Sequence, residues 1–173
     1  MKIMGLDCST KSSGWSVFED GELIDFGLIT SIHSDWRERL FHQGMELGKI
    51  LDAYHPEKIY MEDVPLYHAG GSKTLMMLGA VQGLIYGVAA SKNISINFIQ
   101  PSEWRSPLGL FDGTRKGTLR AEMKRKSIEK ANELFDLNLV YKSPSSKFNE
   151  DDIADAILVC YSQIKQRAFG SKH

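Results

Sequence analysis

Residues 2–30 of this chain have the sequence KIMGLDCSTKSSGWSVFEDGELIDFGLIT, and this stretch decides the fold. Three largely apolar runs, at 2–8, 14–19 and 22–30, are separated by short polar segments. The second separator contains Asp20-Gly21, and an Asp-Gly pair between two such runs is typical of a tight hairpin turn. The pattern therefore predicts three consecutive strands that form a meander.

Helical and strand patterns alternate beyond this meander. Apolar residues at helical spacing predict a helix over 35–54, with Ser34 or Asp35 as its N-cap. The elements expected after it are strands at 58–63 and 94–99, helices at 72–90, 101–104 and 114–135, a polar and mobile connection at 136–149, and a last helix capped by Asn149. This order predicts an α/β fold with a five-stranded mixed sheet flanked by helices, in a single domain over 1–173.

Length, charge and cysteine content narrow the class of protein. A chain of 173 residues fits one domain with a proper core. The formal net charge of -1 does not indicate a nucleic-acid binder, so such a partner would need a local basic patch. Cys8 and Cys160 lie in apolar runs and are expected to be reduced thiols, which suits a cytoplasmic protein. No secretory signal and no small-molecule cofactor site are predicted.

The stretch 72–90 is almost uncharged and carries Gly79, Gly83 and Gly87 at four-residue spacing. Its length and small residues are compatible with a membrane helix, but Lys73 and Gln82 interrupt it. We predict no membrane span and favour a buried helix whose glycine face allows close packing. For the glycine spacing itself, simple packing on the sheet competes with a self-complementary homodimer face, and we favour the homodimer face.

Four acidic residues stand where a metal-dependent nuclease needs them. Asp7 and Glu62 close predicted strands, and Asp152 with Asp155 project from one side of the last helix. Four gathered carboxylates repel one another unless cations neutralise them, and hard cations such as Mg²⁺ prefer oxygen ligands. Two alternatives stay open: Asp63 competes with its neighbour Glu62, and Asp151 can replace Asp152 as the partner of Asp155.

Three segments in order carry a family resemblance. Gly5-Leu6-Asp7-Cys8-Ser9-Thr10, followed by Ser13-Gly14-Trp15-Ser16-Val17, resembles the opening hairpin of the ribonuclease H-like superfamily. With Glu62-Asp63-Val64 and Asp152-Ile153-Ala154-Asp155-Ala156 added, nearly the whole chain resembles the RuvC family of Holliday-junction resolvases. The resemblance implies a ribonuclease H-like fold and a homodimer that makes paired nicks in four-way or other branched DNA.

The same resemblance implies a metal site and its chemistry. Two Mg²⁺ ions, for which Mn²⁺ can substitute, would be bound by the catalytic residues Asp7, Glu62, Asp152 and Asp155. The chain departs from the family where Pro65 replaces a phenylalanine and where Asp7-Cys8-Ser9 replaces Asp-Pro-Gly. Tyr67 is a candidate for the missing stacking role. These departures suggest a divergent member, such as a phage-encoded one.

A basic segment supplies the candidate DNA contacts. Between residues 114 and 130, seven Lys and Arg side chains face only Glu122 and Glu129. Lys116, Arg120 and Lys124 recur at four-residue spacing, with Arg115 beside them. Because one sign of charge prevails in a nearly neutral chain, we predict contacts with DNA phosphates. Arg105, Lys142 and Lys147 would extend this track.

Three other functions compete with a junction resolvase. A ribonuclease H acting on RNA–DNA hybrids would place a glutamate on the first long helix, for which Glu46 is the candidate. A non-catalytic junction-binding protein would not need the four acids. The opening motif also resembles actin-like sugar kinases, but those enzymes need two such domains, and this chain has no second copy.

Overall fold

The computed structural model describes residues 1–63, 71–111 and 119–170, with side chains as far as Arg167. A five-stranded sheet has the order β3-β2-β1-β4-β5. Its strands are β1 (Lys2–Cys8), β2 (Ser12–Glu19), β3 (Glu22–Thr30), β4 (Lys58–Glu62) and β5 (Ser95–Ile99). The first three pair antiparallel, whereas β4 and β5 run parallel to β1. The predicted mixed sheet is therefore confirmed.

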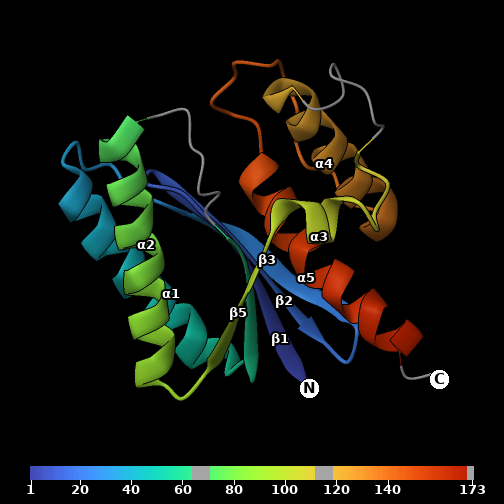
Figure 1. Ribbon diagram of the computed structural model, residues 1–173, viewed down its shortest axis with the longest axis horizontal. Helices are drawn as coiled ribbons and strands as arrows, with labels where there is room; N and C mark the ends of the chain where they lie inside the picture. The colour runs from blue at the N-terminus through green and yellow to red at the C-terminus, as the bar shows by residue number, and fades with distance from the viewer. Residues whose placement is uncertain (64–70, 112–118, 171–173) are drawn as a thin grey trace.

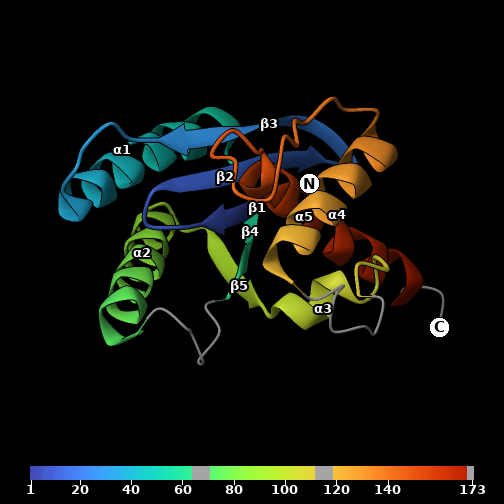
Figure 2. The same ribbon diagram turned by 90° about the horizontal axis from the view of Figure 1, so that it is seen from above.

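Helices cover both faces of the sheet (Figures 1 and 2). The helices are α1 (Trp36–Tyr54), α2 (Gly71–Ser91), α3 (Pro101–Arg105), α4 (Arg120–Phe135) and α5 (Asp151–Gly170). Helices α1 and α2 lie on one face, while α5 lies on the other with α3 and α4 beside it. The sheet is thus the middle layer of three, and each face has its own core.

Two local signals in the sequence operate as predicted. The Asp35 side chain caps α1 by accepting hydrogen bonds from the backbone N–H groups of Arg37 and Glu38. Asp20 and Gly21 both have positive φ, at 50° and 95°, as a tight hairpin between β2 and β3 requires. Strand β2 begins at Ser12, two residues earlier than expected, and its ladder to β1 reaches Cys8.

Alternation along the strands sends neighbouring side chains into different cores. In β1, Ile3 packs in the α5 core, whereas Met4 and Leu6 pack in the core under α1 and α2. Because side chains alternate along a strand, Asp7 shares the face of Ile3. In β4, Tyr60 belongs to the α5 core, so Glu62 is directed to that same face.

Two glycines set how closely α5 approaches the sheet. A Cβ placed on Gly5 would lie 2.0 Å from the carbonyl oxygen of Ala156, and one on Gly14 would lie 1.9 Å from that of Asp152. No side chain larger than hydrogen fits at such separations. Strands β1 and β2 therefore contact the backbone of α5 directly, which brings the start of this helix to the end of β1.

The structure corrects the prediction that residues 72–90 form a buried helix. Only Val81, Ile85 and Ala89 of α2 are buried, and no atom of residues 1–63, 71–111 or 119–167 lies within 4 Å of a Cβ added to its three spaced glycines. By length and composition α2 could cross a membrane, with 17% of its apolar window buried. Helix α2 packs against α1 along one side, because its residues Val81 and Ile85 belong to the core under α1 and α2.

Three further predictions of local structure are wrong. Helix α4 begins at Arg120, and not at residue 114 as predicted, and Leu119 just before it is 57% exposed. Asn149 does not cap the last helix, because its side chain bonds instead to the backbone of Lys142 and Ser143. The connection before α5 is not loose, since hydrogen bonds close it between Val140 and Glu150. Cys8 and Cys160 are free thiols.

Candidate active site

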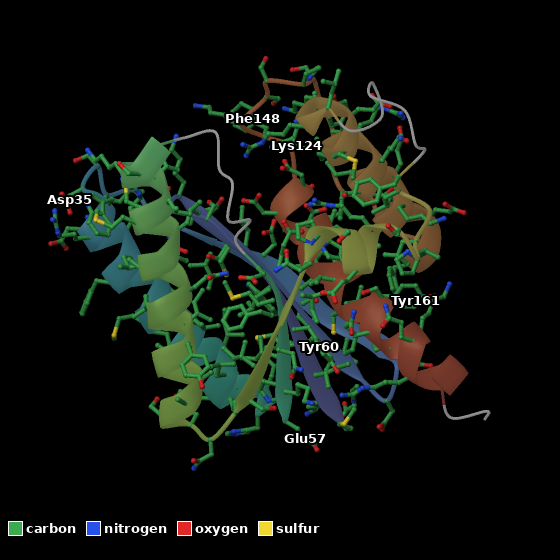
Figure 3. All side chains as sticks on the ribbon, in the orientation of Figure 1. Asp35, Glu57, Tyr60, Lys124, Phe148 and Tyr161 are labelled. Carbon is green, nitrogen blue, oxygen red and sulfur yellow. The ribbon has the colours of Figure 1, made fainter. Side chains whose placement is uncertain are left out.

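The ends of two parallel strands place Asp7 beside Glu62. Leu6 of β1 is paired with Met61 of β4 in parallel register, so the next residue of each strand lies at the same end of the sheet. Both side chains are directed to the α5 face. This end of the sheet is the upper one in Figure 1, because Glu57, which precedes β4, lies at the lower end (Figure 3).

Helix α5 adds Asp152 and Asp155 to this pair. The Ser12 hydroxyl donates a hydrogen bond to Oδ2 of Asp152, which holds that carboxylate against the start of β2. Asp151 turns away, because its Oδ2 pairs with Lys124 Nζ at 2.5 Å. Of the two predicted pairings, the structure therefore favours Asp152 with Asp155.

Burial raises the pKa of all four carboxyl groups, and like charge adds to this effect at Asp7, Asp152 and Asp155. For Asp7 the largest cause is removal from water, followed by the charges of Glu62, Asp155 and Asp152. Removal from water also raises the pKa of Glu62 and of Asp152, and it raises the pKa of Asp155 to about 7. Because the charges of the other three acids all raise the pKa of Asp7, the four carboxyl groups interact electrostatically as one site.

Arg105 of α3 lies between two of these acids. Its Nη2 is 3.1 Å from Oε2 of Glu62 and 3.2 Å from Oδ2 of Asp155. Side-chain exposure is only 15–17% for all three residues. The guanidinium lowers the pKa of both acids and so opposes the effect of burial. Arg105 therefore supplies one positive charge to a site of four carboxyl groups.

Trp104, the residue before this arginine, anchors Glu62. Its indole is fully buried and donates from Nε1 to Oε2 of Glu62 at 2.7 Å. A capping box formed by Gln100 and Glu103 starts the short helix α3 and fixes its position. No pattern in the sequence predicted a role for Trp104, and Arg105 was expected only to extend the DNA-binding track. The reason is that no periodicity links a five-residue helix to a carboxylate on a strand.

Asp63 is separated from the group, although it follows Glu62 directly. Its two carboxylate oxygens accept hydrogen bonds from Gln82 Nε2 at 3.2 Å and Gln100 Nε2 at 2.8 Å. Successive residues of an extended segment point to opposite sides, so the two acids diverge. The structure therefore favours Glu62 as the site residue.

The donor atoms suit a hard divalent cation, although they are not arranged around one. Across residues 1–63, 71–111 and 119–167, no group of three or more His, Cys, Asp or Glu side chains is gathered as a ready metal site. Arg105 is inserted among these acids instead. Within the described part of the chain, Asp155 Oδ1 and Arg105 Nε are both buried without a hydrogen-bond partner. An oxygen-only donor set with an unsatisfied buried carboxylate oxygen fits Mg²⁺ or Mn²⁺.

The predicted DNA contacts are only partly within the described residues. Tyr67, Arg115 and Lys116 lie outside them. Arg120 is exposed, and both it and Lys124 act to lower the pKa of Asp152, so they lie on the side of α4 that faces the acids. Lys124 lies at the upper end of the molecule in Figure 3.

Much of the remaining charge on α4 is compensated within the helix. Arg125 pairs with Glu122 and Glu129, and Lys130 pairs with Glu133 at 3.0 Å. The basic surface is therefore narrower than the sequence predicted, and it is concentrated in the first turns of α4.

Relatives and solved structures agree on one family. The family described as "Crossover junction endodeoxyribonuclease RuvC" matches residues 3–119. A protein of that description from Caldicellulosiruptor saccharolyticus is 25% identical over 170 residues, which cover 95% of this chain and 92% of the relative. One from Fusobacterium nucleatum is 28% identical over 177 residues, covering 99% and 83%.

Solved structures support the same fold. RuvC of Thermus thermophilus in complex with a Holliday junction has a TM-score of 0.72 at 14% identity, covering 98% of this chain and 96% of that one. The yeast mitochondrial Holliday junction resolvase has a TM-score of 0.64 at 17% identity, covering 96% and 78%. The predicted ribonuclease H-like fold is thus confirmed, and this chain belongs to the RuvC family of crossover junction endodeoxyribonucleases.

Proposed function

We propose that this protein resolves four-way DNA junctions by paired, metal-dependent nicks. One observation gives this proposal its main support. Four acids lie together at one end of the sheet, and the pKa of each is raised: Asp7, Glu62, Asp152 and Asp155. A fold seldom assembles four repelling carboxyl groups unless a cation neutralises them. Membership of a family of crossover junction endodeoxyribonucleases supports a DNA phosphodiester as the substrate.

Asp7, Glu62, Asp152 and Asp155 are the residues that would hold two Mg²⁺ ions, or Mn²⁺ in their place. Bound there, the ions would polarise the scissile phosphate and lower the pKa of an attacking water. Asp7 lies within the electrostatic reach of all three other acids, because the charge of each one raises its pKa. It is therefore the residue we assign to both ions.

The remaining side chains of the site position the acids or compensate their charge. Trp104 holds Glu62, and the Ser12 hydroxyl holds Asp152. Arg105 pairs with Glu62 and Asp155 and compensates part of their charge, and it would have to move aside for a cation to reach both acids. Once displaced, its guanidinium is close enough to the site to contact a DNA phosphate. Arg120 and Lys124 flank the acids from α4 and would bind the backbone of a DNA arm.

Helix α2 supports a homodimer as the active form. Its uncovered stripe contains small and apolar residues at three- and four-residue spacing, namely Leu75, Met76, Gly79, Gly83, Tyr86, Gly87 and Ala90. Met76 and Tyr86 are 57% and 56% exposed. Small residues at this spacing let two helices approach closely, and burial of the stripe against a second copy would remove it from water. Two copies would also supply the two active sites that paired nicks need.

Cleavage of a synthetic four-way junction tests this function. The junction is incubated with the protein in Mg²⁺, beside linear duplex, a flap and an RNA–DNA hybrid of the same sequence. We expect symmetric nicks in the junction, their loss in EDTA, and their loss in the variants Asp7→Asn and Glu62→Gln. Asp63→Asn is the matched control and should cut normally, because Asp63 faces away from the site.

Two outcomes would replace this proposal by another function. Cleavage of the hybrid alone would indicate a ribonuclease H. Junction binding without cleavage in Mg²⁺ or Mn²⁺ would indicate a non-catalytic junction-binding protein.

A further inference from the structure

Phe148 is an exposed aromatic side chain in a basic setting. It is 60% exposed and belongs to the connection between α4 and α5. The ammonium groups of Lys142 and Lys147 lie 4.7 Å and 5.4 Å from the centre of its ring. Among the residues that the structure describes, neither lysine forms a salt bridge with an acid. An exposed aromatic ring and two cations without a salt-bridge partner therefore occur together.

Hydrogen bonds give this loop a defined shape. Asn149 accepts from the backbone N–H of Lys142 at 2.8 Å and donates to the carbonyl oxygen of Ser143 at 2.8 Å. The backbone N–H of Phe148 donates to the Ser146 hydroxyl at 3.1 Å. These bonds hold the two lysines and the ring on one compact loop.

The two ends of the loop are also joined. The backbone N–H of Glu150 donates to the carbonyl oxygen of Val140 at 3.0 Å, and the Glu150 side chain accepts from the N–H of Val140 at 2.7 Å. The hydrogen bonds that close the loop therefore hold Phe148 in its exposed position.

The loop stands beside the candidate active site. It leads directly into α5, whose second residue is Asp152. Figure 3 shows Phe148 at the same end of the molecule as Lys124, which pairs with Asp151 of α5. A DNA arm that reaches the acids along Arg120 and Lys124 would pass this ring.

We infer that Phe148 stacks on an unpaired nucleobase at the branch point, while Lys142 and Lys147 bind the adjoining phosphates. This inference rests on the proposed function and adds a base contact to it. An aromatic face accepts any base, and exposed lysines bind phosphate without regard to sequence. Neither group needs to be buried in the free protein for this role, which agrees with their exposure.

Junction binding in EDTA tests the base contact without cleavage. The affinities of wild-type protein, Phe148→Ala and Phe148→Trp are measured on a four-way junction that carries an unpaired base at the branch. Loss of one stacked base predicts binding about tenfold weaker for Phe148→Ala. Phe148→Trp keeps an aromatic face and should bind within about twofold of wild type. Phe41→Ala is the matched control, because Phe41 is 68% exposed on α1, on the opposite face of the sheet.

Two further readouts separate stacking from general charge. A 5-iodouracil at the branch should form a photochemical cross-link to the peptide that contains Phe148, and the cross-link should vanish in Phe148→Ala. The double variant Lys142→Ala, Lys147→Ala should lower the slope of log affinity against log salt by about 0.9 for each lost phosphate contact. These variants alter exposed side chains, so the protein should fold normally.

Equal junction affinity for Phe148→Ala and wild type would overturn the inference, whatever the cleavage assay gives. If wild-type protein cuts the junction and Phe148→Ala still binds it equally well, the base contact is wrong and the resolvase function stands. If wild-type protein neither binds nor cuts the junction, both proposals are wrong.

Discussion

Gly14 of β2 and Asp152 of α5 are in backbone contact, since a Cβ on Gly14 would lie 1.9 Å from the Asp152 carbonyl oxygen. The contact joins the strand that follows Asp7 to the helix turn that carries two of the four acids. Positioning of the site therefore depends on a residue that bears no functional group.

We predict that Gly14→Ala displaces α5 and impairs the site. The added methyl group has no room, so the free energy of unfolding should fall by about 3 kcal/mol, and cleavage should fall more than stability alone explains. Urea unfolding and junction cleavage measure the two effects. Gly48→Ala is the control, because Gly48 has open space around it inside α1 and alanine favours a helix, so its stability should rise by up to about 1 kcal/mol. Equal cleavage by Gly14→Ala and wild type would show that α5 tolerates the shift.

The raised pKa values predict that stability falls as pH rises in the absence of metal. The pKa of Asp155 is about 7 in the folded protein, and an unfolded aspartic acid has a pKa of about 3.9. Between these values the folded state holds the proton more strongly, so deprotonation disfavours folding as pH increases from about 4 to about 7. Thermal unfolding in EDTA should therefore give a lower Tm at pH 8 than at pH 5.

Replacement of Asp155 tests whether this residue causes the decrease of Tm with rising pH. The variant Asp155→Asn cannot ionise, so its Tm should change less with pH and exceed the wild-type value at pH 8 in EDTA. Mg²⁺ should raise the wild-type Tm at pH 8, because it binds the ionised acids. Asp52→Asn on the surface is the control and should keep the wild-type slope, since the Asp52 side chain is 66% exposed. An unchanged slope in Asp155→Asn would assign the effect to other groups.

Arg105 is predicted to stabilise the metal-free protein and to compete with metal. The variant Arg105→Gln leaves Glu62 and Asp155 without their shared cation, so unfolding in EDTA should require about 3 kcal/mol less free energy. In Mg²⁺ the difference in unfolding free energy between Arg105→Gln and wild type should be smaller. Isothermal titration calorimetry should show tighter Mg²⁺ binding by the variant, because no guanidinium has to be displaced. Lys92→Gln disrupts an exposed ion pair with Asp52 and should change neither quantity appreciably. Weaker Mg²⁺ binding by Arg105→Gln would contradict the competition.

The α2 stripe is predicted to hold the homodimer together. Met76→Glu places a charge on the exposed stripe near its N-terminal end, so the dimer should dissociate into monomers in sedimentation velocity experiments. Monomers should nick a junction on one strand only, because each carries a single site. Met45→Glu is the control, since Met45 is 52% exposed on α1, outside the stripe. A Met76→Glu protein that stays dimeric would exclude α2 as the interface.

Local patterns in the sequence predicted the elements of this fold well. The Asp20-Gly21 turn, the Asp35 cap and the five strands follow from preferences that act within a few residues. Where the predictions were wrong, contacts distant in the sequence had decided the outcome. Asn149 bonds to the loop and not to the helix, and α2 leaves exposed the face that carries its glycines.

The residues of the candidate site also fall into those that local sequence predicted and those that tertiary contacts decided. Asp7 and Glu62 were predictable because each lies at the C-terminal end of a strand, and Asp152 with Asp155 because they share one side of a helix. Tertiary structure decided that Asp152 and not Asp151 faces Asp7, that Asp63 turns away, and that Trp104 and Arg105 bind Glu62. Short-range preferences fix which residues form a strand or helix. Which side chains then meet depends on how closely the layers approach, and here that distance is set by Gly5 and Gly14 against the backbone of α5.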